Sequence, residues 1–191
     1  MKEPKLSLFL DRDGVLNRRI PGEYVDHYDR FHWSPHCVQA LQKFQRAFDY
    51  IFVVTNQQGI GKGLMTSAQL EAVHTEMLRE LVAAGVHIHR VYHCPDLNSK
   101  PDNCRKPSPA MGYRAQKEFP EVNFDRSVMI GDSHSDLQFA RGLGMVSVWI
   151  NGELERKQNV VDEDYDFAFS TLSDASKSID EILYTIWFRS S

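Results

Sequence analysis

The chain has 191 residues, 42% of them hydrophobic, with 22 lysine and arginine residues against 26 aspartate and glutamate residues. This length and apolar content suit one compact domain. The net charge of −4 argues against a general electrostatic attraction to nucleic acid or to an anionic membrane. We therefore expect a small-molecule partner, with neither nucleic acid nor a membrane involved.

Targeting signals and cysteine usage indicate the compartment. No apolar run approaches the roughly 18 residues that a membrane span requires, and the opening MKEPKLSLFLD is too short and too soon acidic for a signal peptide. Three cysteines cannot all pair, and no Asn-x-Ser/Thr motif occurs. We expect a soluble cytoplasmic protein in a reducing compartment.

Short apolar runs alternate with longer amphipathic stretches, a pattern that predicts βαβ units around a parallel sheet. Strands are predicted at residues 6–10, 50–54, 86–92, 127–130 and 145–150, with an edge strand at 167–169. Helices are predicted at 35–48, 66–84, 109–119, 135–143 and 173–188, the second starting with a capping box of Thr66 and Gln69. We expect one domain over residues 1–191, in which 151–191 form a C-terminal strand and helix extension.

The segment 17–34 is the one long irregular stretch in the first half of the sequence. Long loops of this kind are usually functional or disordered. This one contains Tyr24, Tyr28, Phe31 and Trp33, which is too aromatic for disorder. We expect a flap or hairpin over the top of the sheet.

Chemically active side chains follow the predicted strands in four places. Ligands of open α/β sheets bind outside the carboxyl ends of the strands, so these side chains should meet there. An isolated pair of this kind is usually a turn or a solvated face, whereas four in this order indicate a site. The four segments are Asp11 with Asp13, Thr55 with Asn56, Arg105 with Lys106, and Asp132 with Asp136.

The strings LDRDGVLN, VVTNQQGIGKG, CRKPSPAM and IGDSHSDLQFA carry a resemblance to motifs one to four of the haloacid dehalogenase (HAD) superfamily of aspartate-nucleophile phosphatases. Over residues 6–150 the sequence is similar to members of the branch that holds heptose 1,7-bisphosphate phosphatases and histidinol-phosphatases. The resemblance implies a Rossmann-like α/β fold with a doubly wound parallel sheet in the order 5-4-1-2-3. The stretches between the motifs are too short for a large cap domain.

The resemblance also implies roles for the motif residues. Asp11 is expected to be the nucleophile that forms an aspartyl-phosphate, and Asp13 the general acid and base. Mg²⁺ is expected on the carboxylates of Asp11 and Asp132 and the main-chain carbonyl of Asp13. Asp136 is expected to orient these ligands from outside. Thr55, the N–H of Asn56 and Lys106 are expected to hold the phosphoryl oxygens.

The expected substrate is a small phosphorylated metabolite, with a sugar bisphosphate, heptose 1,7-bisphosphate, preferred over histidinol phosphate by resemblance alone. Arg105 and the flap residues Arg18, Arg19 and Tyr24 are candidates for contacts with the rest of the substrate. A polynucleotide 3′-phosphatase shares the Thr-Asn-Gln-x-Gly wording, but the net charge argues against it. A phospho-accepting signalling domain is a further alternative, although there the acceptor normally follows the third strand.

The resembled branch usually carries a zinc cluster of Cys-x-His and Cys-x-Cys in the loop before the third motif. This sequence has Cys94, Asp96, Asp102 and Cys104 there. Two thiolates with two short acids form a less usual zinc set, so a structural zinc site and a loop without zinc both stay open. We expect a monomer, and the sequence leaves a dimer open.

Overall fold

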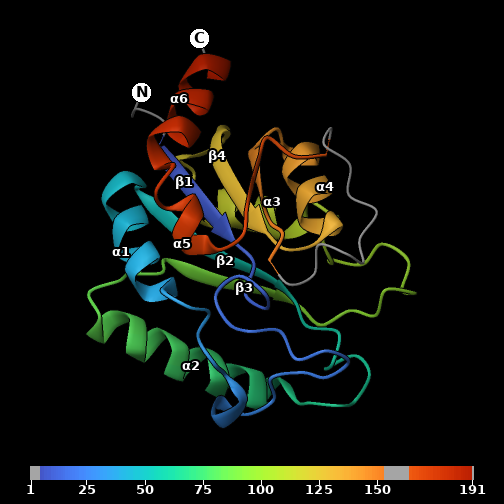
Figure 1. Ribbon diagram of the computed structural model, residues 1–191. Helices are drawn as coiled ribbons and strands as arrows, with labels where there is room; N and C mark the ends of the chain where they lie inside the picture. The colour runs from blue at the N-terminus through green and yellow to red at the C-terminus, as the bar shows by residue number, and fades with distance from the viewer. Residues whose placement is uncertain (1–4, 153–163, 191) are drawn as a thin grey trace.

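The computed structural model describes residues 5–152 and 164–190, and its centre is a six-stranded parallel sheet in the order β3-β2-β1-β4-β5-β6 (Figure 1). The α/β class and the predicted order 5-4-1-2-3 are confirmed, and β6 adds the expected edge strand. Within the described ranges, no large cap domain interrupts the sheet and its helices. The strands are β1 (Lys5–Leu10), β2 (Tyr50–Asn56), β3 (Arg90–Cys94), β4 (Val122–Gly131), β5 (Val146–Ile150) and β6 (Phe167–Phe169).

Helices cover both faces of the sheet and bury two separate apolar clusters (Figure 1). Neighbouring residues of a strand point to opposite faces, so Leu8 and Leu10 join one cluster and Phe9 joins the other. The first cluster lies under α1 (Cys37–Ala47), α2 (Ser67–Ala83), α5 (Leu172–Ala175) and α6 (Ile179–Ser190), and the second under α3 (Ala110–Glu118) and α4 (His134–Leu143). None of the described helices is long and apolar enough to span a bilayer.

Helix α2 begins where the sequence predicts. Thr66 Oγ1 accepts a hydrogen bond from the main-chain N–H of Gln69 at 3.2 Å, and Gln69 Oε1 accepts one from the N–H of Thr66 at 2.8 Å. This capping box satisfies two N–H groups that the first turn of a helix otherwise leaves unpaired. The helix then packs a fully buried stripe on the sheet, formed by Leu70, Val73, Met77 and Leu81.

Three predicted elements were wrong in their bounds. Strand β4 begins at Val122 rather than at residue 127. Strand β3 is Arg90–Cys94 rather than 86–92. At His89 the pairing is mixed: its N–H donates to the carbonyl of Ile51 at 2.8 Å, but the N–H of Ile51 donates to the His89 side chain, at Nδ1, at 3.1 Å, so regular strand pairing begins at Arg90. The predicted helix 173–188 is two helices, α5 and α6, separated at residues 176–178. There the Ser176 hydroxyl donates to the carbonyl of Ser173 at 2.7 Å, which favours ending the first helix.

The segment 17–34 is ordered, with a 3-10 helix at Tyr28–Arg30. The rings of Tyr28 and Phe31 stack with centroids 5.3 Å apart, and Trp33 meets Phe31 edge-on at 4.9 Å. Trp33 Nε1 donates to Glu80 Oε2 at 2.7 Å, which ties the segment to α2. The segment leaves the carboxyl end of β1 and passes beside α2 (Figure 1). Its aromatic residues therefore pack it against the domain.

Candidate active site

The carboxyl ends of the central strands bring the predicted motif residues together. Asp11 follows β1, Thr55 lies at the end of β2, and Asp132 follows β4. All three side chains are buried, with relative exposures of 5% or less. Asp11 and Thr55 line one end of a cavity of about 420 Å³, whose walls also include Asp13, Asn56, Lys106 and Asp136, and Asp132 lies beside Asp11 and Asp136.

Lys106 is a buried cation beside Asp11. Its Nζ lies 2.7 Å from Asp11 Oδ1 and 2.5 Å from Asp136 Oδ1, and it donates a hydrogen bond to the carbonyl of Val54 at 2.6 Å. Burial disfavours the charged amine, but the charges of Asp11 and Asp136 outweigh it and raise the pKa of Lys106 above its ordinary value. Lys106 is therefore a fixed positive charge beside Asp11.

Asn56 holds the main chain of Lys106 on both sides. Asn56 Oδ1 accepts a hydrogen bond from the Lys106 N–H at 2.9 Å, and Asn56 Nδ2 donates to the Lys106 carbonyl at 3.2 Å. This side-chain role went unnoticed in the sequence, where only the N–H of Asn56 was assigned a function. The end of β2 therefore positions Lys106 directly.

Three carboxylates gather where the sequence predicts a metal. Asp11, Asp132 and Asp136 each bring a ligand atom within 4.8 Å of the others. Burial raises the pKa of Asp11 to about 6, although Lys106 opposes this, and burial raises the pKa of Asp132 well above its ordinary value. Buried carboxylates whose negative charge is unfavourable are the environment that a divalent cation stabilises.

Gly14 and Arg19 show that a cation fits beside Asp132. Gly14 has φ +98°, and a Cβ at this position would lie 1.9 Å from Asp132 Oδ2, so only glycine leaves the carboxylate its place. The guanidinium of Arg19 lies against two oxygens that the sequence assigns to Mg²⁺. Its Nη2 is 2.8 Å from Asp132 Oδ1 and 3.4 Å from the carbonyl of Asp13. The donor set is all oxygen, which suits Mg²⁺.

Asp136 is held by its own helix as well as by Lys106. The main-chain N–H and the hydroxyl of Ser133 both donate to Asp136 Oδ2, at 3.0 Å and 2.6 Å. These bonds close the first turn of α4 and aim the other oxygen at Lys106. They fit the predicted orienting role, which stays a prediction.

Asp13 is surrounded by hydrogen-bond donors that the sequence analysis missed. Arg12 Nη2 donates to both of its oxygens at 2.9 and 2.8 Å, Gln57 Nε2 donates to Oδ2 at 2.8 Å, and Asn17 Nδ2 donates to Oδ1 at 3.0 Å. Burial raises the pKa of Asp13, but the charge and hydrogen bonds of Arg12, with those of the two amides, outweigh it and leave the pKa below its ordinary value. In the sequence, Arg12 lies between Asp11 and Asp13, and this position was the signal that could have indicated its contact with Asp13.

The far wall of the cavity comes from the flap and from the loops after β2 and β3. Arg19, Tyr24 and Arg105 line it as predicted, whereas Arg18 is exposed and does not. Lys62, in the turn before α2, also lines the cavity, with its Nζ 5.7 Å from the centre of the Tyr24 ring. Of the two neighbouring arginines, Arg19 carries the side chain that turns inward, and a substrate contact of Arg18 stays a prediction.

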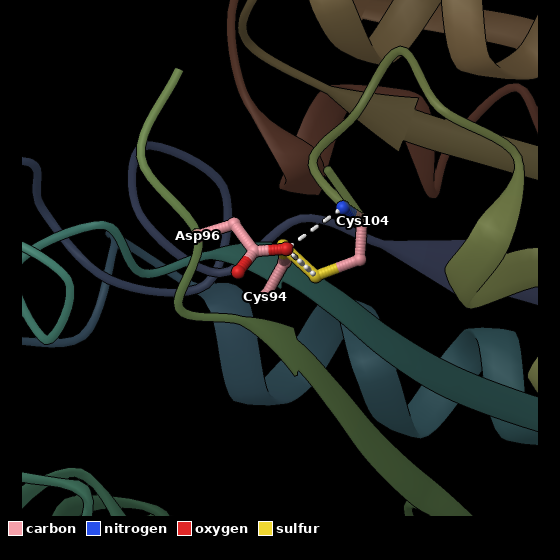
Figure 2. A group of neighbouring side chains, drawn as sticks. All are labelled: Cys94, Asp96 and Cys104. Atoms are coloured by element: carbon pink, nitrogen blue, oxygen red, sulfur yellow. Dashed lines mark hydrogen bonds between the residues drawn. A yellow bond between two sulfur atoms is a disulfide. The ribbon is translucent and has the colours of Figure 1, made fainter. Parts of the chain in front are cut away.

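The loop at residues 94–104 differs from the expected zinc set (Figure 2). Cys94 and Cys104 form a disulfide, and Asp96 Oδ2 accepts a hydrogen bond from the N–H of Cys104 at 3.1 Å. Among the described residues, the metal-ligand group at this loop is Cys94, Asp96 and Cys104, without Asp102, which adopts a left-handed turn at φ +50°. Bonded sulfurs are not thiolates, so the disulfide agrees with the second of the two alternatives that the sequence left open, a loop without zinc.

A family model described as HAD-hydrolase-like matches residues 103–175. The α/β sheet with an acidic site at the carboxyl ends of its strands, together with this match, defines a hydrolase of the HAD-like class. The chain is similar to D-glycero-alpha-D-manno-heptose-1,7-bisphosphate 7-phosphatase of Mycobacterium bovis, with 40% identity over 136 residues that cover 71% of this chain and 72% of the relative.

A second relative is the D-glycero-beta-D-manno-heptose-1,7-bisphosphate 7-phosphatase of Rhodopseudomonas palustris, 36% identical over 76% of this chain and 83% of its own length. The solved D,D-heptose 1,7-bisphosphate phosphatase from B. bronchiseptica, complexed with magnesium and phosphate, matches with a TM-score of 0.81 and 27% identity, covering 92% of this chain and 98% of that one. The chain belongs to the HAD-like phosphatase family of these enzymes and is a phosphoric monoester hydrolase.

Proposed function

We propose that this protein removes the 7-phosphate of D-glycero-D-manno-heptose 1,7-bisphosphate through an aspartyl-phosphate on Asp11. The observation that carries the proposal is the buried contact of Asp11 with Lys106 at one end of a cavity whose other wall holds Arg105 and Lys62. Such a cavity places positive charge at two separate points and suits a substrate with two phosphates. The names of the relatives support the choice of heptose.

In the first step a carboxylate oxygen of Asp11 attacks phosphorus in line, and the bond from phosphorus to the sugar oxygen breaks. Asp13 gives its proton to that leaving oxygen. The surrounding donors favour an ionised Asp13, and the approaching phosphate dianion raises its proton affinity through like-charge repulsion. Water then attacks phosphorus, Asp13 takes the proton of the water, and inorganic phosphate leaves with Asp11 restored.

Asp11, Asp132 and the main-chain carbonyl of Asp13 would hold Mg²⁺, whose charge offsets the repulsion between carboxylate and phosphate. The hydroxyl of Thr55 and the charge of Lys106 neutralise the remaining phosphoryl oxygens. Gln57 Nε2 donates to Thr55 Oγ1 at 2.9 Å, so the Thr55 hydroxyl hydrogen is free to point at phosphate.

The second phosphate is assigned to Arg105. Its Nε and Nη1 atoms are buried and have no hydrogen-bond partner within the described residues, and burial lowers the pKa of Arg105 from its ordinary value. A buried cationic donor without an acceptor is costly, and a bound anionic group would supply the missing acceptor. Lys62 and Tyr24 complete this wall of the cavity.

The test is a comparison of the two anomers of heptose 1,7-bisphosphate, heptose 7-phosphate and histidinol phosphate. We expect kcat/KM to be highest for one bisphosphate anomer. Arg105→Ala should lower kcat/KM for the bisphosphate by about tenfold or more, the loss of one charge-assisted contact, while changing turnover of the 7-monophosphate little. Arg18→Ala is the matched control. Equal losses on mono- and bisphosphate, or preference for histidinol phosphate, would contradict the proposal.

A further inference from the structure

Arg12 is the largest fully buried side chain of the described domain, with 0% exposure. Its Nη2 binds both oxygens of Asp13, and its Nη1 lies 3.1 Å from His74 Nε2. A buried guanidinium needs an acceptor for each donor that is shielded from water. His74 supplies the acceptor on the side of Arg12 that faces away from Asp13.

The chemistry of this contact settles which nitrogen of His74 carries the proton. Arginine has donors only, so His74 Nε2 has to accept, and the proton of the neutral ring has to lie on Nδ1. His74 is 8% exposed. Burial, the charge of Arg12 and the nearby ring of His93 lower the pKa of His74 to about 3, with Asp13 acting in the opposite direction. The ring is therefore neutral and able to accept.

We propose that His74 is a positioning residue of the reaction: it fixes the guanidinium of Arg12, which in turn fixes the orientation of the Asp13 carboxylate. The proposal rests on the role given to Asp13 under the proposed function. His74 lies on α2, 62 positions along the chain from Arg12 and outside the four motifs. Loss of its acceptor would leave Arg12 Nη1 buried and unpaired, so Arg12 would turn toward another acceptor. Small displacements of a proton-transferring group can cost about 100-fold in rate.

A purely structural role for His74 predicts a different result. His74 is next to Val73 in the buried stripe of α2, and a core residue acts on stability alone. A misplaced general acid slows departure of a sugar oxygen, which needs a proton, more than departure of p-nitrophenolate, which leaves without one. The value of kcat/KM depends on the steps up to and including the departure of the leaving group. Comparing kcat/KM on the two substrates therefore distinguishes a positioning role of His74 from a purely structural one.

The kinetic test compares His74→Leu, His74→Gln and the control Val73→Ala on heptose 1,7-bisphosphate and p-nitrophenyl phosphate. We expect His74→Leu to lose about tenfold or more in kcat/KM on the sugar and less than about threefold on p-nitrophenyl phosphate. His74→Gln, whose amide oxygen can accept from Arg12, should stay within about threefold of wild type on both. Val73→Ala should lose stability but little activity. Equal losses on both substrates, or full activity of His74→Leu on the sugar, would overturn the proposal.

A measurement on the wild-type enzyme covers the case in which His74→Leu does not fold. The ¹⁵N NMR spectrum should show His74 with a proton on Nδ1 and none on Nε2, unchanged from about pH 5 to about pH 8. A proton on Nε2 would overturn the proposal without any variant. Asp13→Asn, assayed in parallel, reports on the proposed function separately: activity retained on the sugar would refute the acid role of Asp13, whatever the His74 variants do.

Discussion

Replacing Arg19 with alanine should tighten the binding of Mg²⁺ in the absence of substrate. The guanidinium of Arg19 contacts Asp132 Oδ1 at 2.8 Å and the carbonyl of Asp13 at 3.4 Å, two of the three oxygens assigned to the ion. The ion and the side chain therefore compete for the same atoms. Wild-type protein has to break the contact of Arg19 before the metal can take its place, and the alanine variant does not.

The size of the effect follows from the burial of the pair. The side chain of Asp132 is 3% exposed and that of Arg19 is 39% exposed. A fully exposed ion pair contributes about 0.2–1 kcal/mol, and a hydrogen bond to a charged group about 1.5–3 kcal/mol. A pair that is buried on one side lies between these limits, at about 1.4 kcal/mol, which corresponds to about a tenfold change in Kd.

Isothermal titration of the metal-free protein with MgCl₂ at about pH 8 measures this change. The alkaline buffer limits competition from protons, because the pKa of Asp132 is raised. Arg18→Ala is the control, since Arg18 is exposed and does not line the cavity. We expect Arg18→Ala to bind as wild type does. Unchanged or weaker binding by Arg19→Ala would refute the competition.

Asp11→Asn should abolish turnover and keep the fold, and activity above about a tenth of wild type would exclude Asp11 as the nucleophile. Folding raises the pKa of Asp11 from 3.8 to about 6, so the folded protein holds this proton to a higher pH than the unfolded chain does. The free energy of unfolding of metal-free wild type should therefore fall as the pH rises from about 4 to about 6. Urea denaturation should show a smaller loss for Asp11→Asn. Lys106→Met should lower the free energy of unfolding near pH 7 by about 3–5 kcal/mol, since it leaves buried acids without their cation; a loss below about 1 kcal/mol would contradict this. Thiol titration of the denatured, unreduced protein should find Cys37 alone, and three reactive thiols would show that the disulfide of Cys94 and Cys104 does not form in solution.

Local sequence signals predicted those parts of the fold that depend on neighbouring residues. The capping box of Thr66 and Gln69 is complete within four residues, so the start of α2 was predicted correctly. The start of β3 was wrong because it depends on His89, whose side chain reaches across to Ile51 on another strand. The division of α5 from α6 rests on the hydroxyl of Ser176, which competes with the helical main chain and leaves no mark in the apolar pattern.

The sequence predicted the acidic and basic residues of the candidate site. It predicted less well the neighbouring side chains that position these residues. The geometry of a parallel sheet brings strand ends together, so Asp11, Thr55 and Asp132 converge as expected. His74 went unnoticed because its link to Arg12 joins two distant segments, and its spacing on α2 resembles that of an ordinary core residue. The inward turn of Arg19 rather than Arg18 depends on the path of the flap, which spacing alone does not determine.

The two hydrogen bonds between the Asn56 side chain and the main chain of Lys106 have a consequence for the loop at residues 95–105, which precedes this lysine. Because the Asn56 side chain holds the main chain of Lys106, a strand as well as the loop at residues 95–105 fixes the position of this lysine beside Asp11. Changes of sequence in that loop should therefore disturb the second phosphate site at Arg105 more than the reacting atoms around Asp11. The loop at residues 95–105 is therefore the segment in which substitutions should change substrate preference with the least effect on the reaction itself.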